Sequence, residues 1–170
     1  MVSKFLVSVH DLMNRSGLMR EHELKIELDA PMGIVGIELG AGDTIDIGLR
    51  LESVHEGILA TAVIDSTAHG ECSRCLDKIE IPIEVDFQEL FAYSGVSEDD
   101  FTVVDEHIDL EQIIRDEVVL SLPFQPVCSP DCQGLCPECG VKLADNPSHA
   151  HEEQVDARWS ELQNFRTKEE

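Results

Sequence analysis

Four of the six cysteines lie in one short segment, residues 128–140, which restricts the fold more than any other part of the chain. The segment reads Cys-Ser-Pro-Asp-Cys-Gln-Gly-Leu-Cys-Pro-Glu-Cys-Gly, and its prolines and glycines exclude a regular helix or strand. Its second half, from Cys136 to Gly140, has the two-residue gap of a zinc knuckle and a glycine that relieves the turn. The segment is therefore expected to be organised by a metal ion.

Two further groups of possible metal ligands accompany this cluster. Cys72 and Cys75 form a second Cys-x-x-Cys pair far upstream, and His149 and His151 follow the cluster at alternate positions, which share one side of an extended segment. A structural zinc ion takes four nitrogen or sulfur ligands, so eight candidates suffice for two sites. The favoured assignment places one Zn²⁺ on Cys72, Cys75, Cys128 and Cys132, and a second on Cys136, Cys139, His149 and His151.

Two alternatives to this assignment remain open. In the first, a single all-cysteine zinc joins the two Cys-x-x-Cys pairs, Cys128 and Cys132 are spare thiols, and the two histidines belong to a solvated loop. In the second, the zinc is catalytic, since His69-Gly70-Glu71 has the His-x-Glu form of zinc deaminases. The chain lacks the proline that precedes the cysteine pair in those enzymes, so we expect His69 to be a surface residue and the protein not to be an enzyme.

The net charge is strongly acidic and unevenly distributed. Twelve Lys and Arg residues stand against 35 Asp and Glu, for −23, and residues 1–25 contribute +1 of this total. Such a charge repels a phosphate backbone at long range and favours a basic protein partner. Direct RNA binding by a zinc ribbon is the alternative, with Arg74 inside the first knuckle as the basic residue placed for a base contact.

The compartment and domain organisation follow from length and hydropathy. At 170 residues, one compact unit is expected, formed by a β-rich domain over 1–127 and a zinc-knuckle segment over 128–170 that packs on it. No signal peptide and no apolar run long enough to span a membrane are visible. We therefore expect a cytoplasmic protein, in whose reducing surroundings clustered cysteines serve as metal ligands.

Short apolar-polar alternations separated by Gly, Asp and Pro predict an α+β fold with an antiparallel sheet or partly closed barrel. The first cysteine pair is expected at a hairpin tip, and Pro82 indicates a sheet edge or a bulge because proline cannot donate to a ladder. A helix is predicted near 109–122, capped by Asp109, and a short terminal helix around Trp159. The predicted strands cover residues 5–9, 24–28, 34–39, 44–51, 57–71 and 79–87.

The chain combines short motifs at residues 9–12, 70–76, 87–91, 108–110, 122–128, 131–140 and 155–159. In this combination it resembles the YceD family of large ribosomal RNA subunit accumulation proteins. The resemblance extends over nearly the whole sequence, and some members of the family carry cysteines where this chain has His149 and His151. It departs from the family's usual Asp-Pro-Arg at Asp156-Ala157-Arg158.

The resemblance implies a non-enzymatic, cytoplasmic factor for biogenesis of the large ribosomal subunit, linked to accumulation of 23S ribosomal RNA. The acidic charge adds an expectation about the partner. A chain at −23 is better suited to hold a basic large-subunit ribosomal protein, or a pre-ribosomal particle through such a protein, than to grip RNA.

Overall fold

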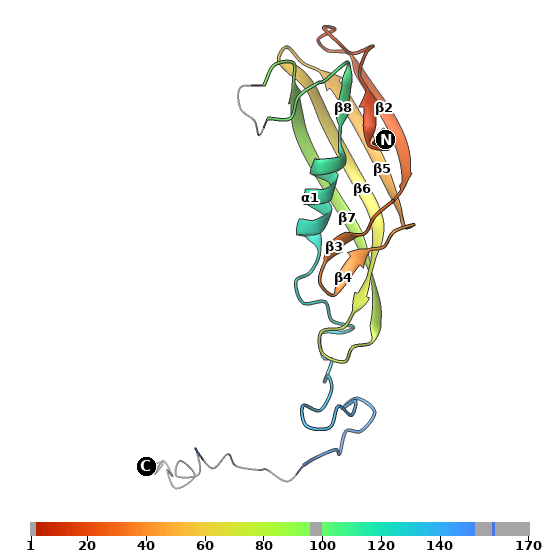
Figure 1. Cartoon of the computed structure of the whole chain (residues 1–170), viewed down its shortest axis with the longest axis vertical. Helices are drawn as coiled ribbons and strands as arrows, with labels where there is room; N and C mark the ends of the chain where they lie inside the picture. Colours follow the sequence, from red (N-terminus) through yellow and green to blue (C-terminus); the bar gives the residue numbers. More distant parts are fainter. Residues whose placement is uncertain (1–2, 96–99, 152–157, 159–170) are drawn as a thin grey trace. The chain divides into compact units, whose positions relative to one another are not determined.

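The computed structural model describes residues 3–95, 100–151 and 158, which fall into two compact units, Met1–Cys132 and Gln133–Glu170 (Figure 1). The first unit contains the strands and the helix, as the predicted α+β class requires. Among the described residues no helix has the length and apolar character needed to cross a membrane. The predicted terminal helix around Trp159 lies outside the described residues, and its packing on the β-rich part stays a prediction.

A long central strand, β6 (Gly57–Glu71), organises the main sheet. Along one edge it pairs with β7 (Lys78–Ala92), and along the other with β5 (Thr44–Ser53) and then with β4 (Ile37–Leu39). All these pairings are antiparallel, and the six-stranded sheet stays open rather than closing into a barrel. The remaining elements are β1 (Leu6–Ser8), β2 (Met19–Glu27), β3 (Met32–Ile34), β8 (His107–Asp109) and helix α1 (Glu111–Ser121).

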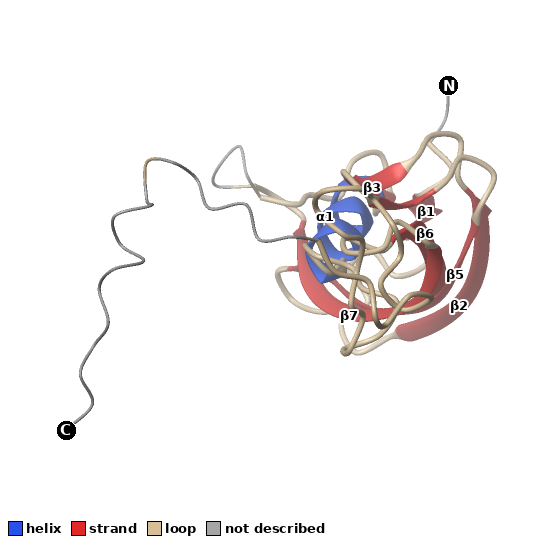
Figure 2. Cartoon of the chain, turned by 90° about the horizontal axis from the view of Figure 1, so that it is seen from below, coloured by secondary structure: helices blue, strands red, loops and turns tan. Residues whose placement is uncertain are grey.

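The core lies on the inner side of the curved sheet, where α1 packs (Figure 2). The core forms there because apolar and polar residues alternate along the strands, and every second residue of a strand points to the same face. In β5, for example, Ile45, Ile47, Leu49 and Leu51 are buried and the residues between them are not. The helix contributes its buried residues Ile113, Ile114 and Val118.

The hairpin β6–β7 carries the first cysteine pair at its tip, as predicted. Its register runs without a bulge from the pair Gly57↔Ala92 to the pair Glu71↔Lys78. Within the part of the chain that the structure describes, β7 has no strand on its other side, so Pro82 lies on a sheet edge. This confirms the first of the two positions expected for that proline and excludes the bulge.

Two local predictions need correction, and one short strand is additional to those predicted. The segment predicted as one strand over 34–39 is a hairpin, β3–β4, because Gly36 at φ +94° turns the chain between them. Strand β8 was not predicted, because its three residues are too short to show periodicity; it pairs with β1. Helix α1 begins at Glu111 with Leu110 as its N-cap, and the Asp109 carboxylate accepts a hydrogen bond from the Glu111 N–H at 3.0 Å without occupying the cap position.

Candidate metal centres

The hairpin tip of β6–β7 folds into a knuckle around Cys72. The Cys72 N–H donates to the Asp77 carbonyl at 2.8 Å, and the Leu76 N–H donates back to the Cys72 carbonyl at 2.9 Å. To close this turn Leu76 adopts φ +60°, a region that favours glycine. The turn also directs the Arg74 N–H toward the Cys72 sulfur, at 3.5 Å. The backbone of the tip is thus arranged around a sulfur atom.

The segment that carries Cys128 and Cys132 is bound to this tip by the two residues between Cys72 and Cys75. Both the N–H and the hydroxyl of Ser73 donate to the Pro126 carbonyl, at 2.8 and 2.9 Å. The Arg74 guanidinium donates to the carbonyls of Pro130 and Cys132, at 3.2 and 2.9 Å. Arg74 therefore holds two parts of the protein together, which argues against the base contact considered for it from sequence.

Four sulfurs meet where the two segments join. The ligand atoms of Cys72, Cys75, Cys128 and Cys132 all lie within 4.8 Å of one another. The Cys72 and Cys132 sulfurs are 3.8 Å apart, and those of Cys75 and Cys128 are 3.6 Å apart. Sulfurs at about 2.3 Å from a tetrahedral zinc are separated by about 3.8 Å, so the cluster has the dimensions of a four-thiolate zinc site.

The electrostatics of this cluster favour a cation at its centre. Burial raises the pKa of Cys72, but the backbone N–H groups of Cys128, Cys75 and Arg74 outweigh it and lower the pKa to about 6. The Asp77 N–H lowers the pKa of Cys75, yet burial and the three neighbouring sulfurs raise it to about 12. The first thiolate therefore forms readily, and its charge makes ionisation of the next thiol unfavourable. A divalent ion removes this repulsion because it stabilises every thiolate.

A second knuckle of the same form lies in the second unit. The Cys136 N–H donates to the Val141 carbonyl at 2.8 Å, and the Gly140 N–H donates to the Cys136 carbonyl at 2.8 Å. Gly140 adopts φ +72°, the conformation that Leu76 has in the first knuckle. The chain then turns back through a hydrogen bond from the Leu143 N–H to the Gly134 carbonyl, at 3.0 Å, and returns toward the knuckle.

Two histidines complete this second group. The Nε2 atoms of His149 and His151 lie 3.2 and 3.3 Å from the Cys139 sulfur and 2.9 Å from each other, and Cys136 belongs to the same group within 4.8 Å. In a tetrahedral zinc site the corresponding separations are about 3.6 Å for sulfur to nitrogen and about 3.4 Å between nitrogens. The group could hold a zinc ion after its side chains separate by about half an ångström or less.

Glu138 orients one of these histidines. Its Oε2 lies 3.2 Å from Nδ1 of His151, which leaves Nε2 of the same ring to face Cys139. Metal-binding histidines commonly donate their other ring N–H to a carboxylate, which sets the tautomer and the orientation of the ring. Sequence reasoning missed this contact, although Glu138 lies inside the knuckle itself.

The same knuckle lowers the pKa of Cys136. The backbone N–H groups of Cys139 and Glu138 lower the pKa of its thiol, burial raises it, and the net value is about 6. A thiol with this pKa is largely ionised at neutral pH, which is the form that binds a metal. Each knuckle thus contains one cysteine whose sulfur is prepared for a cation by its own backbone.

The eight candidate ligands therefore fall into two groups of four, Cys72, Cys75, Cys128 and Cys132 in one and Cys136, Cys139, His149 and His151 in the other, as the favoured assignment predicts. His69, the residue considered for catalysis, lies instead on the outer face of the sheet. Its ring nitrogens are 3.6 Å from Asp43 and 3.7 Å from Glu80. The contacts that Ser73 and Arg74 make to the 126–132 segment could not be anticipated, because no sequence pattern encodes them.

Comparison with known proteins assigns the chain to a family. The family described as "Large ribosomal RNA subunit accumulation protein YceD" matches residues 60–166. An uncharacterized protein of Mycobacterium tuberculosis (strain ATCC 25618 / H37Rv) is 45% identical over 167 residues, which cover 94% of this chain and 80% of that protein. An uncharacterized protein of Mycobacterium leprae (strain TN) is 34% identical, over 95% of this chain and 77% of its own length.

A shorter match links the chain to a plant protein. It is 42% identical over 43 residues to the "Large ribosomal RNA subunit accumulation protein YCED homolog 1, chloroplastic" of Zea mays, covering 25% of this chain and 15% of the maize protein. No solved structure matches the chain. The family match covers more than half of the sequence and includes both knuckles, all of β7 and β6 from residue 60 onward. The chain therefore belongs to the YceD family of large ribosomal RNA subunit accumulation proteins.

Proposed function

We propose that this protein is a non-enzymatic factor that supports accumulation of 23S ribosomal RNA during biogenesis of the large ribosomal subunit in the cytoplasm. The observation that carries the proposal is the family match over residues 60–166. The candidate metal centres fit a structural rather than a catalytic role. Each offers four ligands, and a zinc ion with four protein ligands has no open position for water or substrate.

We further propose that each centre binds one zinc ion. The separations of the four sulfurs in the first centre and the outer carboxylate on His151 in the second support zinc. The first ion would join the tip of the β6–β7 hairpin to residues 128–132, and the second would organise residues 136–151. Both ions then act by holding the chain in shape.

The proposed partner is a basic large-subunit ribosomal protein. The outer face of the sheet supports this, because Asp46, Asp65 and Glu84 lie opposite one another on β5, β6 and β7. Like charges in such positions lower the stability of a sheet. Only Asp46 of these three has an ion pair recorded within the described residues, to Lys25 at 3.1 Å. A basic protein would relieve this repulsion on binding.

A capture experiment tests this proposal. The immobilised protein, with its zinc, is exposed to a lysate of the source organism, and the retained proteins are identified by mass spectrometry. We expect a basic large-subunit ribosomal protein, and we expect its binding to weaken steeply as salt rises, because exposed charges are screened over about 8 Å at physiological ionic strength. The same ribosomal protein, purified, should bind directly with the same dependence on salt.

Two outcomes would contradict the proposal. Tight binding of bare ribosomal RNA, with no ribosomal protein retained, would support the RNA-binding alternative despite the net charge of −23. Turnover of a nucleotide or peptide that is lost with the zinc would make a centre catalytic. A protein of equal charge but unrelated fold serves as the control, because it reports how much binding charge alone produces.

A further inference from the structure

Between Pro82 and Leu90, and among the described residues, the outer edge of β7 is an unpaired strand edge. The N–H of Ala92 donates to the Phe101 carbonyl and its own carbonyl accepts from the Val103 N–H, both at 2.9 Å, so the polar backbone groups of Ala92 point away from β6. Backbone groups alternate in direction along a strand, and the β6–β7 register has no bulge. The N–H and C=O groups of Glu84, Asp86 and Gln88 therefore also point away from β6.

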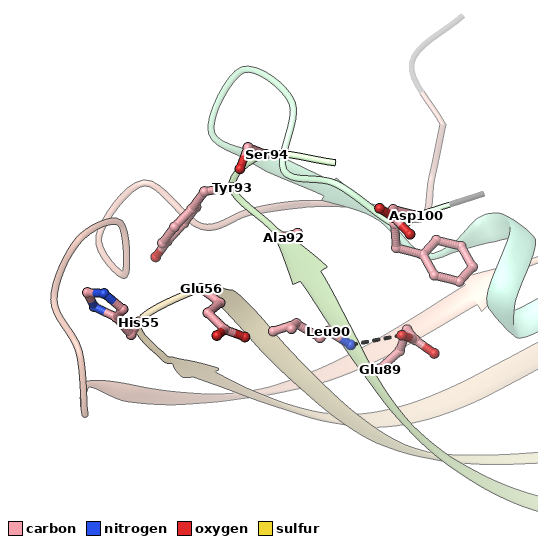
Figure 3. A pocket seen from close by; sticks show the side chains of 9 residues that line it. His55, Glu56, Glu89, Leu90, Ala92, Tyr93, Ser94 and Asp100 are labelled. Atoms are coloured by element: carbon pink, nitrogen blue, oxygen red, sulfur yellow. Dashed lines mark hydrogen bonds between the residues drawn. The ribbon is translucent and has the colours of Figure 1, made fainter. Parts of the chain in front are cut away.

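This free edge has defined ends. Pro82 is one of the alternate residues whose backbone groups point away from β6. It has no N–H, so it interrupts any further ladder on that side. At the other end, the N–H of Leu90 is already used, since it donates to the Glu89 carboxylate at 3.1 Å (Figure 3). Between them, and among the described residues, no strand pairs with this edge of β7 (Figure 1). The edge can therefore accept a short added strand opposite residues 84–88.

A cavity of about 760 Å³ lies at the end of the same edge. Glu56, Glu89 and Asp100 contribute carboxylates to its lining (Figure 3), and Tyr93 and Phe101 contribute aromatic rings. Carboxylates beside aromatic rings suit the head and the stem of an arginine or lysine side chain. The cavity therefore favours a basic side chain.

The charge of the edge selects among possible occupants. Glu80, Glu84 and Asp86 are exposed on the outer face of β7, and Glu84 adds to the row of carboxylates that includes Asp65. A second copy of this chain would bring the same carboxylates against them, and like charges across a strand pair are unfavourable. A strand with lysine or arginine at alternate positions places its charges on the outer face, beside these carboxylates.

We propose that β7 binds an extended, basic segment of a protein partner by strand addition opposite residues 84–88, with one basic side chain in the cavity lined by Glu56 and Glu89. This inference rests on the proposed binding of a basic ribosomal protein and adds the surface and the mode of binding. Backbone hydrogen bonds supply the affinity, and the alternating charges supply the specificity. A segment of about eight residues suffices to reach from the edge to the cavity.

The test uses the full, zinc-loaded chain and a synthetic peptide of about eight residues that alternates lysine and valine. Asp86→Pro removes an N–H that points away from β6, as the missing N–H of Pro82 would. The hydrogen bonds between β7 and β6 are therefore retained. We expect this variant to bind the peptide about tenfold more weakly. Asp86→Asn keeps the N–H and removes the charge, so it should mainly reduce the dependence of binding on salt.

Matched controls separate the edge from the charge. Glu23→Pro places a proline on β2, at the opposite border of the sheet, and should leave binding within about twofold of the unaltered chain. If Asp86→Pro fails to fold, peptides N-methylated on one or the other alternate set of amides give the same information with the unaltered protein. Methylation of only one of the two sets of peptide amides should abolish binding. An arginine added to the peptide end that reaches the cavity should strengthen binding, and Glu56→Gln should remove that gain.

The outcomes distinguish the inference from the proposed function. If Asp86→Pro and both methylated peptides bind as their parents do, strand addition is wrong, although capture of a ribosomal protein can still succeed. If the unaltered chain binds neither the peptide nor a basic ribosomal protein, both proposals fail. If Asp86→Pro changes only a dimer of this chain into a monomer, measured by sedimentation, the edge serves self-association and the inference is overturned.

Discussion

Replacing Cys136 and Cys139 together by serine is expected to release one zinc ion per chain and to unfold the described part of the second unit. Between residues 133 and 151 that unit has a single β-bridge, Leu135↔Lys142, and Cys136 is its one buried side chain. Burial of apolar surface therefore contributes little to its stability. A structural zinc site supplies on the order of 10 kcal/mol of folding free energy, and nothing else described in this unit approaches that amount.

Zinc content measured by elemental analysis, together with amide hydrogen exchange, tests this expectation. Exchange should become fast over residues 134–149 and remain slow in β5 and β6. Ser148→Ala is the matched control, since it changes an exposed neighbour of His149 and leaves all four ligands in place. Retention of two zinc ions by the double variant would contradict the assignment of these cysteines.

Replacing Cys72 and Cys75 together by serine is expected to remove the other zinc ion and to release residues 126–132 from the hairpin tip. Both thiols are buried, and hydrogen bonds from Ser73 and Arg74 also hold that segment to the tip. Each such bond contributes about 1 kcal/mol, far less than a zinc site. The sheet should persist, because β6 and β7 remain paired along their whole length away from the tip.

Far-ultraviolet circular dichroism should therefore change little in this variant, while exchange over residues 126–132 becomes fast. Ser73→Ala removes one hydroxyl hydrogen bond and should keep both zinc ions. The pair of double variants also decides between two zinc ions and one. If a single zinc joined Cys72 and Cys75 to Cys136 and Cys139, either double variant would leave the chain with no zinc at all.

The sheet could be predicted from sequence where periodicity was long. The alternation from Ile79 to Phe87 predicts β7, and Pro82 predicts an edge or a bulge, of which the structure has the edge. The short elements could not be predicted in the same way. The three residues of β8 are too few to show an apolar-polar period. The sequence predicts β3 and β4 as one strand, because Gly36 alone marks the turn between them.

The candidate metal centres were predictable to a different degree. Cysteine spacing defined the two knuckles, because a Cys-x-x-Cys turn is a local structure. The approach of Cys128 and Cys132 to the hairpin tip depends on contacts between residues more than 50 positions apart, such as Arg74 with Cys132. These contacts are made by backbone carbonyls, which carry no signature in the sequence. For the same reason the sequence does not show which backbone groups of β7 point away from β6, because only the hydrogen bonds of Ala92 reveal it.

The most direct test of the central claim is the ratio of 23S to small-subunit ribosomal RNA in cells of the source organism that lack this protein. The proposed function predicts a lower ratio, restored by the unaltered chain and not by the variant with serine at Cys72 and Cys75. Ser73→Ala, which keeps every ligand, should restore it fully. An unchanged ratio in the deletion strain, at growth rates where ribosome synthesis is fast, would contradict the claim.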